Sequence, residues 1–119
     1  TYTPWELLEH MRIAQWDILA FIRDPDHVSP DWPEGYWPAE GETATAEDWE
    51  QTVAQIRSDR EALIALVEDP KMDLTAPLPH AAAYNVMREI LTVADHSGYH
   101  LGEFALMRGV MGTWPEGRG

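Results

Sequence analysis

Three long segments of the chain carry apolar residues at the spacing of an α-helix, and proline-rich stretches separate them. They cover about residues 4–24, 45–69 and 81–111. Within each segment, apolar residues recur every three to four positions, which is typical of a helix that buries one face. No stretch alternates apolar and polar residues as a half-buried strand does. The sequence therefore predicts an all-α fold without β-strands.

The ends of these segments carry signals that define helix boundaries. Thr3 is a suitable N-cap, Pro4 occupies the first helical position, and Glu6 completes a capping box. Thr45 is the expected N-cap of the second helix, and Gly112 is the expected stop of the third. A chain of 119 residues is long enough for one core and too short for two. We therefore expect a single domain, 1–119.

The chain is strongly acidic, because 21 Asp and Glu residues against 8 Lys and Arg give a net charge of −13 at pH 7. Such a field repels phosphate backbones and anionic lipid headgroups, so we expect neither a nucleic-acid nor a membrane partner. No apolar run approaches the roughly 20 residues that a membrane helix needs. The chain has no cysteine, which excludes disulfides and a thiolate metal site and fits a reducing cytoplasm.

The third segment is apolar around most of its circumference and therefore needs neighbours on several sides. Two other helices of about 20 residues supply too little cover for it. We expect a fourth helix to complete the packing, either from a segment that precedes Thr1 or from a second subunit, and the second alternative predicts a homodimer. Gly98 and Gly102 lie on the face roughly opposite His96, and they predict the close approach of another backbone there.

Three histidines lie on apolar helix faces. His96 and His100 are four residues apart, on one face of the third helix, and His10 lies in the apolar stripe of the first. Three neutral imidazoles with an open fourth position are typical of a catalytic zinc-type site. Histidines in such places are also common as hydrogen-bonded core residues, so the residues alone leave both interpretations open. The zinc-protease motif is excluded, since it needs glutamate where Ser97 stands.

Three stretches together resemble the DinB-like (DinB/YfiT) superfamily: "WELLEHMRIAQWDIL" near the start, "WPEGYWP" in the first loop and "VADHSGYHLGE" near the end. Members of that superfamily are metal-binding helical bundles of bacteria. The resemblance covers nearly the whole chain, and its most specific element is the spacing of the three histidines. It implies a four-helix bundle in which His10, His96 and His100 hold a divalent metal, often nickel or zinc.

The resemblance also implies a function, namely a metal-dependent enzyme that acts on a small-molecule substrate. Members with assigned activities include transferases and isomerases that use low-molecular-weight thiols such as bacillithiol, mycothiol or glutathione. This chain has no cysteine, so a sulfur nucleophile would come from such a cosubstrate. A hydrolase that uses water fits equally well, because a divalent ion activates either group. The competing interpretation is a non-catalytic bundle whose metal stabilises the fold or the dimer.

Three further side chains are weaker candidates for the site. Glu103 follows His100 by three residues, so it can accept a hydrogen bond from an imidazole or act as a general base, although a solvated carboxylate is as reasonable. Asp17 lies seven residues after His10 on the same helix face, and it could orient an imidazole or pair with an arginine. Arg60 interrupts the apolar stripe of the second helix and could anchor an anionic substrate or form an ordinary ion pair.

The loops contribute aromatic residues and two more histidines. The stretch from Trp32 to Pro38 is aromatic and stiff, and it could cover either the metal pocket or an exposed edge of the core. His27 and His80 lie in or beside proline-rich loops and are expected to be exposed. Since imidazole binds metal only when it is unprotonated, metal affinity is expected to fall steeply below about pH 6.

Overall fold

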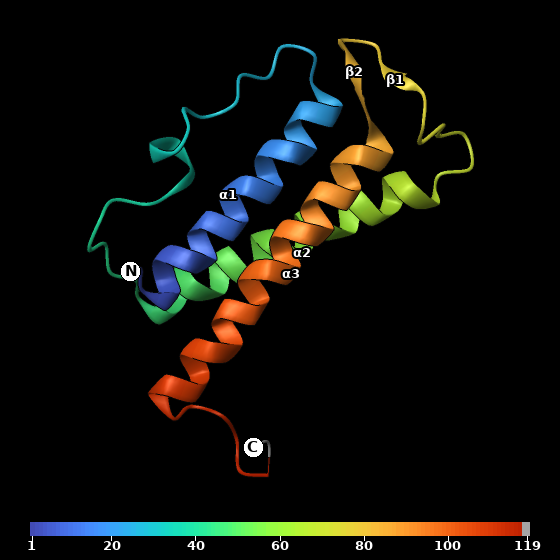
Figure 1. Ribbon diagram of the computed structural model, residues 1–119. Coiled ribbons are helices and arrows are strands. Elements are labelled where there is room, and N and C mark those ends of the chain that lie inside the picture. Colours follow the sequence, from blue (N-terminus) through green and yellow to red (C-terminus); the bar gives the residue numbers. More distant parts are fainter. Residues whose placement is uncertain (118–119) are drawn as a thin grey trace.

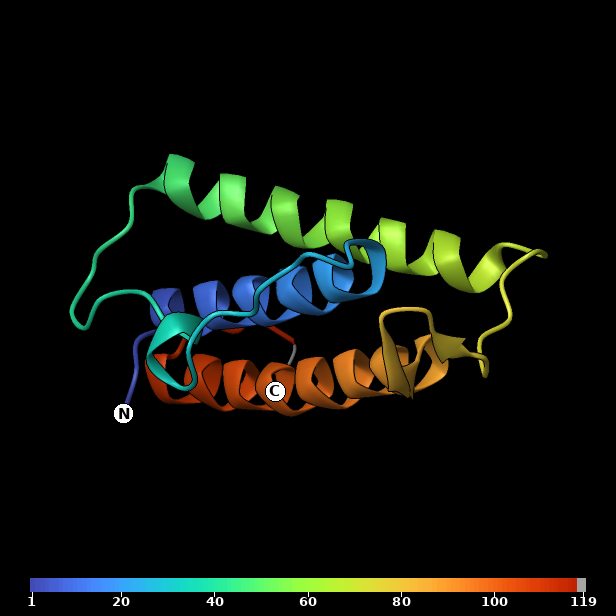
Figure 2. The ribbon, with the colours of Figure 1, turned by 90° about the horizontal axis from the view of Figure 1, so that it is seen from above.

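Three α-helices make up most of the computed structural model, which describes residues 1–117 (Figure 1). Helix α1 spans Pro4–Arg23, α2 spans Ala46–Glu68 and α3 spans Val86–Met111. The long loop from α1 to α2 contains a short 3₁₀ helix, η1, at Glu34–Tyr36. Helix α1 lies between α2 and α3 and packs against both (Figure 2). The mostly helical fold agrees with the predicted class.

Reciprocal hydrogen bonds cap the helices where the sequence predicts them. At α1, the Thr3 hydroxyl accepts from the backbone N–H of Glu6, and the Glu6 carboxylate accepts from the backbone N–H of Thr3. Thr45 and Asp48 form the same pair at α2. Helix α3 ends at Gly112, whose φ of 64° lies in the left-handed region that favours glycine.

A small β-hairpin stands where the sequence predicts the first turn of the third helix. Strands β1, Pro77–Leu78, and β2, Ala81–Asn85, pair in antiparallel fashion. The prediction of a longer third helix and of no strands is therefore wrong here. Three successive alanines favour a helix by intrinsic propensity. However, the Asn85 side chain caps α3 by accepting from the backbone N–H of Arg88, and Leu78 is buried in the core, so packing overrides propensity.

The hydrophobic core gathers at the end of the molecule where the hairpin meets all three helices. Its buried members are Leu19, Ile22, Leu63, Leu78 and Val86. Towards the other end, an apolar groove of about 590 Å³ is lined by α1, α2 and the C-terminal half of α3. The four-helix bundle is not confirmed, because residues 1–117 supply three helices and leave this groove open.

The exposed face of α3 also lacks a neighbour within the described chain. A Cβ atom added at Gly98 or Gly102 has no heavy atom within 4 Å among residues 1–117, so the predicted close approach is not made there. Leu101 and Val110 on the same helix are 60% and 90% exposed. None of the helices in the described part of the chain combines the length and the hydropathy that a membrane span requires.

Candidate metal centre

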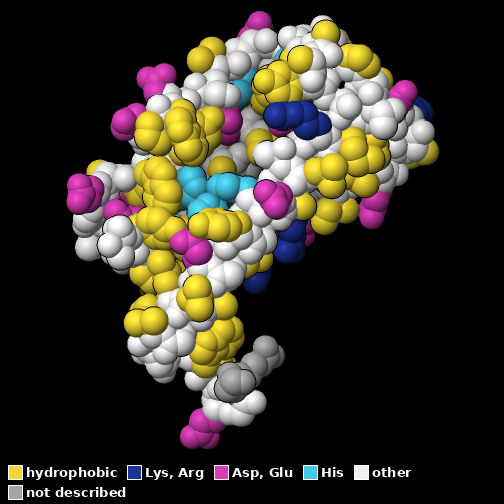
Figure 3. Space-filling view, in the orientation of Figure 1, with side chains coloured by type: hydrophobic (Ala, Val, Ile, Leu, Met, Phe, Trp, Pro, Cys, Tyr) yellow, Lys and Arg dark blue, Asp and Glu magenta, His cyan; other side chains and the backbone are white. Residues whose placement is uncertain are grey.

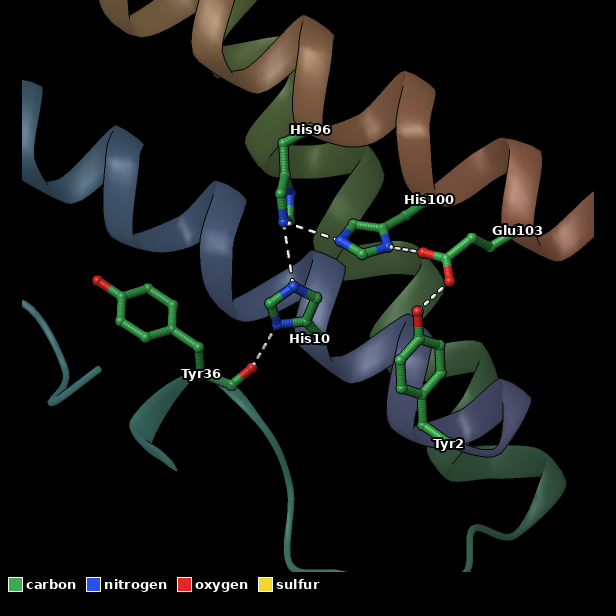
Figure 4. A network of polar contacts seen from close by, with 6 residues as sticks. All are labelled: Tyr2, His10, Tyr36, His96, His100 and Glu103. Atoms are coloured by element: carbon green, nitrogen blue, oxygen red, sulfur yellow. Dashed lines mark hydrogen bonds and ion pairs between the residues drawn. The ribbon is translucent and has the colours of Figure 1, made fainter. Parts of the chain in front are cut away.

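Three histidines from two helices converge between α1 and α3 (Figure 4). His10 extends from α1, and His96 and His100 extend from successive turns of α3. The Nε2 atom of His96 lies 3.0 Å from Nε2 of His10 and 3.0 Å from Nε2 of His100. His10 and His100 are buried and His96 is half-buried. The structure thus brings together the three histidines that the sequence singles out, which we call the triad.

The outer ring nitrogens of two triad members already have partners. Nδ1 of His10 lies 2.8 Å from the backbone carbonyl oxygen of Tyr36, and Nδ1 of His100 lies 2.5 Å from a carboxylate oxygen of Glu103. A carbonyl and an ionised carboxylate only accept hydrogen bonds, so both Nδ1 atoms carry the proton. The Nε2 atom of each neutral ring then carries a lone pair. Both Nε2 atoms point toward His96 (Figure 4).

Burial favours the uncharged form of His10 and His96. It lowers the pKa of His10, and it lowers the pKa of His96 to about 4, with a further contribution from the neighbouring His100 and His10. Both rings are therefore neutral at pH 7. A proton on Nε2 of His96 can bond to only one of the two lone pairs that face it. The protein alone therefore leaves lone pairs directed at one another in the centre of the triad.

This donor set fits a divalent metal ion. Neutral imidazole nitrogens are common ligands of zinc, nickel and copper. With metal–nitrogen bonds of about 2.1 Å, two ligand nitrogens lie about 3.0 Å apart at a right angle and about 3.4 Å apart at the tetrahedral angle. The two measured Nε2 separations of 3.0 Å agree with this range. A cation among the lone pairs would replace their repulsion with attraction.

Glu103 links the triad to the N-terminus. One oxygen of its carboxylate accepts from His100, and the other accepts from the hydroxyl of Tyr2 (Figure 4). The hydrogen bond from Tyr2, followed by that from His100, lowers the pKa of Glu103. The same bond to Glu103 raises the pKa of Tyr2 to about 12. Glu103 thus lies where an acceptor for a triad imidazole is expected, and the carboxylate is ionised at neutral pH.

The loop between α1 and α2 covers one side of His10. The ring of Trp37 stacks on the His10 ring with centroids 3.9 Å apart and planes 4° from parallel. Tyr2 in turn packs on Trp37. Of the aromatic stretch, Trp37 therefore lies against the triad. The sequence could not reveal the Tyr36 carbonyl as a hydrogen-bond partner, because a backbone oxygen leaves no mark in the residue types.

Asp17 accepts from an imidazole, one of the two roles that the sequence suggested, but this imidazole lies outside the triad. Its carboxylate accepts one hydrogen bond from Nε2 of His27 and another from the hydroxyl of Tyr36, both 2.7 Å long. Within residues 1–117, the alternative ion pair with an arginine is not formed. Burial, followed by the hydrogen bond to Asp17, raises the pKa of Tyr36 to about 12, so the hydroxyl acts as a donor at neutral pH.

The prediction that His27 and His80 are exposed is wrong. The side chain of His27 is 9% exposed. His80 is half-buried, and its Nε2 atom lies 2.7 Å from the carbonyl oxygen of Phe21. Both loops fold back onto the C-terminal half of α1, where His27 contacts the Asp17 carboxylate and His80 contacts the Phe21 carbonyl. A position in a loop therefore does not place a histidine in solvent.

Arg60 is not part of the histidine site. It is exposed and lines the apolar groove together with Arg57 and Arg108, whereas none of the triad histidines lines that groove. Histidine side chains are visible near the centre of the space-filling view, with hydrophobic side chains around them (Figure 3).

Comparison with protein families agrees with the site. The family model described as the DinB superfamily matches residues 2–104, which include all three triad histidines. The chain belongs to the DinB superfamily. Neither the curated proteins nor the solved structures compared with the chain gave a significant match. The family match and the buried histidines together support a metal-binding DinB protein, and they leave the reaction to be inferred from the site.

Proposed function

We propose that this DinB protein is a metal-dependent enzyme whose His10, His96 and His100 bind one divalent ion. The observation that carries the proposal is the convergence of the three Nε2 atoms while two of the Nδ1 protons are held by acceptors outside the triad. Metal-binding histidines generally use one ring nitrogen for the ion and donate from the other. Nickel and zinc are the preferred occupants, since nitrogen-rich sites favour late divalent metals.

The proposed reaction is a thiol-dependent transfer, or a hydrolysis, on a small molecule. A divalent ion at the triad would act as a Lewis acid and lower the pKa of a thiol or water. The chain supplies the remaining functions. Glu103 holds the Nδ1 proton of His100, and Trp37 shields one face of His10 from water. The chain contains no cysteine, so the thiol of the transfer reaction comes from a cosubstrate. We propose the bacterial cytoplasm as its location, where such thiols stay reduced.

A non-catalytic role is the second candidate, and one observation favours it. The triad joins α1 to α3, and the Tyr2–Glu103 hydrogen bond joins the N-terminus to α3. An ion at this place would clip two helices together where the hydrophobic core does not extend. The two candidates differ in whether the ion accepts an exogenous ligand, because a purely structural ion is closed by protein ligands.

Metal analysis of untagged protein tests the site itself. We expect about one nickel or zinc ion per wild-type chain and almost none in His96→Ala, since an ion held by two imidazoles is bound much more weakly. His80→Ala is the matched control, because it removes a histidine outside the triad, and it should retain the metal. Equally low metal in wild type and His96→Ala would reject the metal site.

Cobalt substitution separates the catalytic from the structural role. In the catalytic case, adding bacillithiol, mycothiol or glutathione to the cobalt protein changes its visible absorption, because a thiolate enters the coordination shell. A spectrum that no thiol or competing anion changes would favour the structural role. Turnover with the same thiols and electrophilic small molecules then identifies the reaction, and water alone as the second reactant would identify a hydrolase.

We also propose that a second copy of the chain covers the apolar groove and completes four-helix packing. Arg57, Arg60 and Arg108 border this groove in a chain of net charge −13, so a second copy offers opposite charge to the rim and apolar surface to the floor. Sedimentation analysis should show a dimer that Leu101→Glu weakens, since Leu101 lines the groove. A monomer at high protein concentration would contradict this arrangement.

A further inference from the structure

A second buried polar cluster lies beside the triad and consists of Asp17, His27 and Tyr36. The two oxygens of the Asp17 carboxylate accept from His27 and from the Tyr36 hydroxyl, each over 2.7 Å. Asp17 is 7% exposed, and the rings of Trp16 and His27 pack nearly perpendicular to each other with centroids 5.3 Å apart. The cluster therefore holds the loop onto α1 through two short hydrogen bonds that are shielded from water.

Tyr36 belongs to both clusters. Its side chain donates to Asp17, and its backbone carbonyl accepts from Nδ1 of His10. His10 and Asp17 are both on α1, separated by about two turns. Because both residues belong to one helix, their positions relative to each other are fixed, and Tyr36 contacts both of them. The hydrogen bond from its hydroxyl to Asp17 thus restrains the residue whose carbonyl contacts His10.

The loop has little structure of its own that could fix this carbonyl. The segment that joins α1 to α2 contains only the short helix η1 among its described residues, and Tyr36 is the last residue of that helix. Further along the loop, Gly41 donates its backbone N–H to Glu6 over 3.4 Å, which is a longer contact with an exposed side chain. The hydrogen bond from Tyr36 to Asp17 and the stacking of the neighbouring Trp37 on His10 are therefore contacts that hold the Tyr36 carbonyl in place.

We propose that Asp17 and His27 are positioning residues of the metal centre. They hold Tyr36 so that its carbonyl keeps the proton on Nδ1 of His10 and directs Nε2 of His10 at the triad. This role rests on the metal site proposed above. Neither residue touches the triad. Their effect passes through Tyr36, whose carbonyl is the direct partner of His10. Outer partners of metal-binding histidines fix the tautomer and ring orientation, and their loss commonly weakens metal binding about 10- to 100-fold.

Zinc affinity in competition with a chromophoric chelator tests this role. We expect Asp17→Leu and Tyr36→Phe each to weaken zinc binding about 10-fold. The double variant should be no weaker than Asp17→Leu, because both substitutions break the same chain of contacts and their effects do not add. His27→Gln keeps a donor toward Asp17 and should lose less affinity than His27→Ala. Fully additive losses, or none in either single variant, would overturn the proposal.

Leu63→Val controls for a general loss of stability. Leu63 lies in the hydrophobic core, which lies apart from the loop and the triad, so the variant lowers stability without disturbing Tyr36. It should bind zinc within about twofold of wild type, since distant sites act independently. If Leu63→Val loses as much zinc affinity as Asp17→Leu at equal loss of stability, Asp17 is merely structural and the positioning role is rejected.

Nitrogen NMR of the His10 ring in metal-free protein separates this proposal from the proposed function. Wild type should show the proton on Nδ1 alone, and Asp17→Leu should show a mixture of tautomers. This result does not require metal, so it tests the positioning role even if wild type binds no zinc. If wild type binds zinc through the triad but Asp17→Leu keeps both the tautomer and the affinity, the metal site stands and the positioning role fails.

Discussion

Two polar groups of side chains, called layers below, are centred on residues of α1 that lie seven positions apart. The Asp17 layer is the cluster of Asp17, His27 and Tyr36, and the His10 layer, or histidine layer, is the triad. Their hydrogen bonds differ in kind. In the Asp17 layer, a carboxylate accepts from an imidazole and from a phenol, so each donor meets an acceptor. In the His10 layer, three imidazoles face one another and lone pairs remain at the centre. Buried polar groups are normally paired. In the first layer every donor meets an acceptor, whereas the second would be completed by the cation proposed above.

With the proposed metal bound, one helix would carry both a structural and a binding layer. Complementary donors and acceptors stabilise the fold without any ligand, and they do so at all times. The three imidazoles of the triad lack such complementary partners, so they would stabilise the fold only when an ion is bound. The following predictions distinguish the two layers, beginning with the largest expected effect.

Metal should stabilise the folded chain through the histidine layer alone. A ligand that binds only the folded state stabilises it by about 2.7 kcal/mol at 100 times its Kd. Zinc at that excess should therefore raise the free energy of unfolding of wild type by about this amount, measured by urea titration. His96→Ala should gain almost nothing. An equal gain in the two proteins would show that the ion binds elsewhere.

Without metal, the Asp17 layer should matter more for stability than the histidine layer. Asp17→Leu leaves the Tyr36 hydroxyl and the His27 ring without their acceptor, and we expect the free energy of unfolding to fall by about 2 kcal/mol. The size-matched variant His96→Leu should change it by less than about 1 kcal/mol, or increase it, because an apolar side chain avoids the unpaired lone pairs. Equal losses, measured by thermal unfolding in the presence of a chelator, would remove the distinction.

Glu103→Gln should weaken metal binding about 10-fold, equivalent to about 1.4 kcal/mol. The substitution removes the charge that holds the Nδ1 proton of His100 and the hydroxyl proton of Tyr2. Glu40→Gln is a suitable control, since it removes the same charge from an exposed position in the loop. Competition with a chelator gives both affinities, and similar values for the two variants would remove Glu103 from the site.

The smallest effect concerns the pH dependence of the metal-free protein. The pKa of His96 is lowered from 6.5 to about 4, so the unfolded chain binds more protons than the folded chain between these values. The free energy of unfolding should therefore decrease as the pH falls through this window. Between pH 7 and pH 6 we expect a decrease of less than about 1 kcal/mol, after allowance for solvent screening. His96→Leu should reduce this slope, and a slope of opposite sign would contradict the assignment.

Local sequence signals predicted the helices well but failed where packing competes with propensity. The capping boxes at Thr3 and Thr45 involve neighbouring residues, so their hydrogen bonds can be read from the order of the side chains. The start of α3 could not be read in this way. Ala81–Asn85 became a strand because the hairpin covers the core, and that contact involves residues far apart in the chain.

The candidate site shows the same division. The spacing of His96 and His100 on one helix face follows from helix geometry, and the apolar stripe of the first helix indicated His10 as the third member, which the family resemblance supported. The sequence did not predict Tyr36 as the partner of His10, or His27 as the partner of Asp17. Both partners are in the long loop, and where a loop folds back depends on the surface available to it.

The sequence by itself determined most of the three helical segments, the caps at Thr3, Thr45 and Gly112 and the residue types of the triad, because these depend on periodicity and on neighbours within one or two turns. Only the tertiary structure decided which ring nitrogens face inward, since that depends on a backbone carbonyl of Tyr36 and on the carboxylate of Glu103. It also decided in which of the two layers every hydrogen-bond donor meets an acceptor. Hydrogen bonds have direction and short range, so the position of each partner decides that donors and acceptors are matched at Asp17 and unmatched at His10.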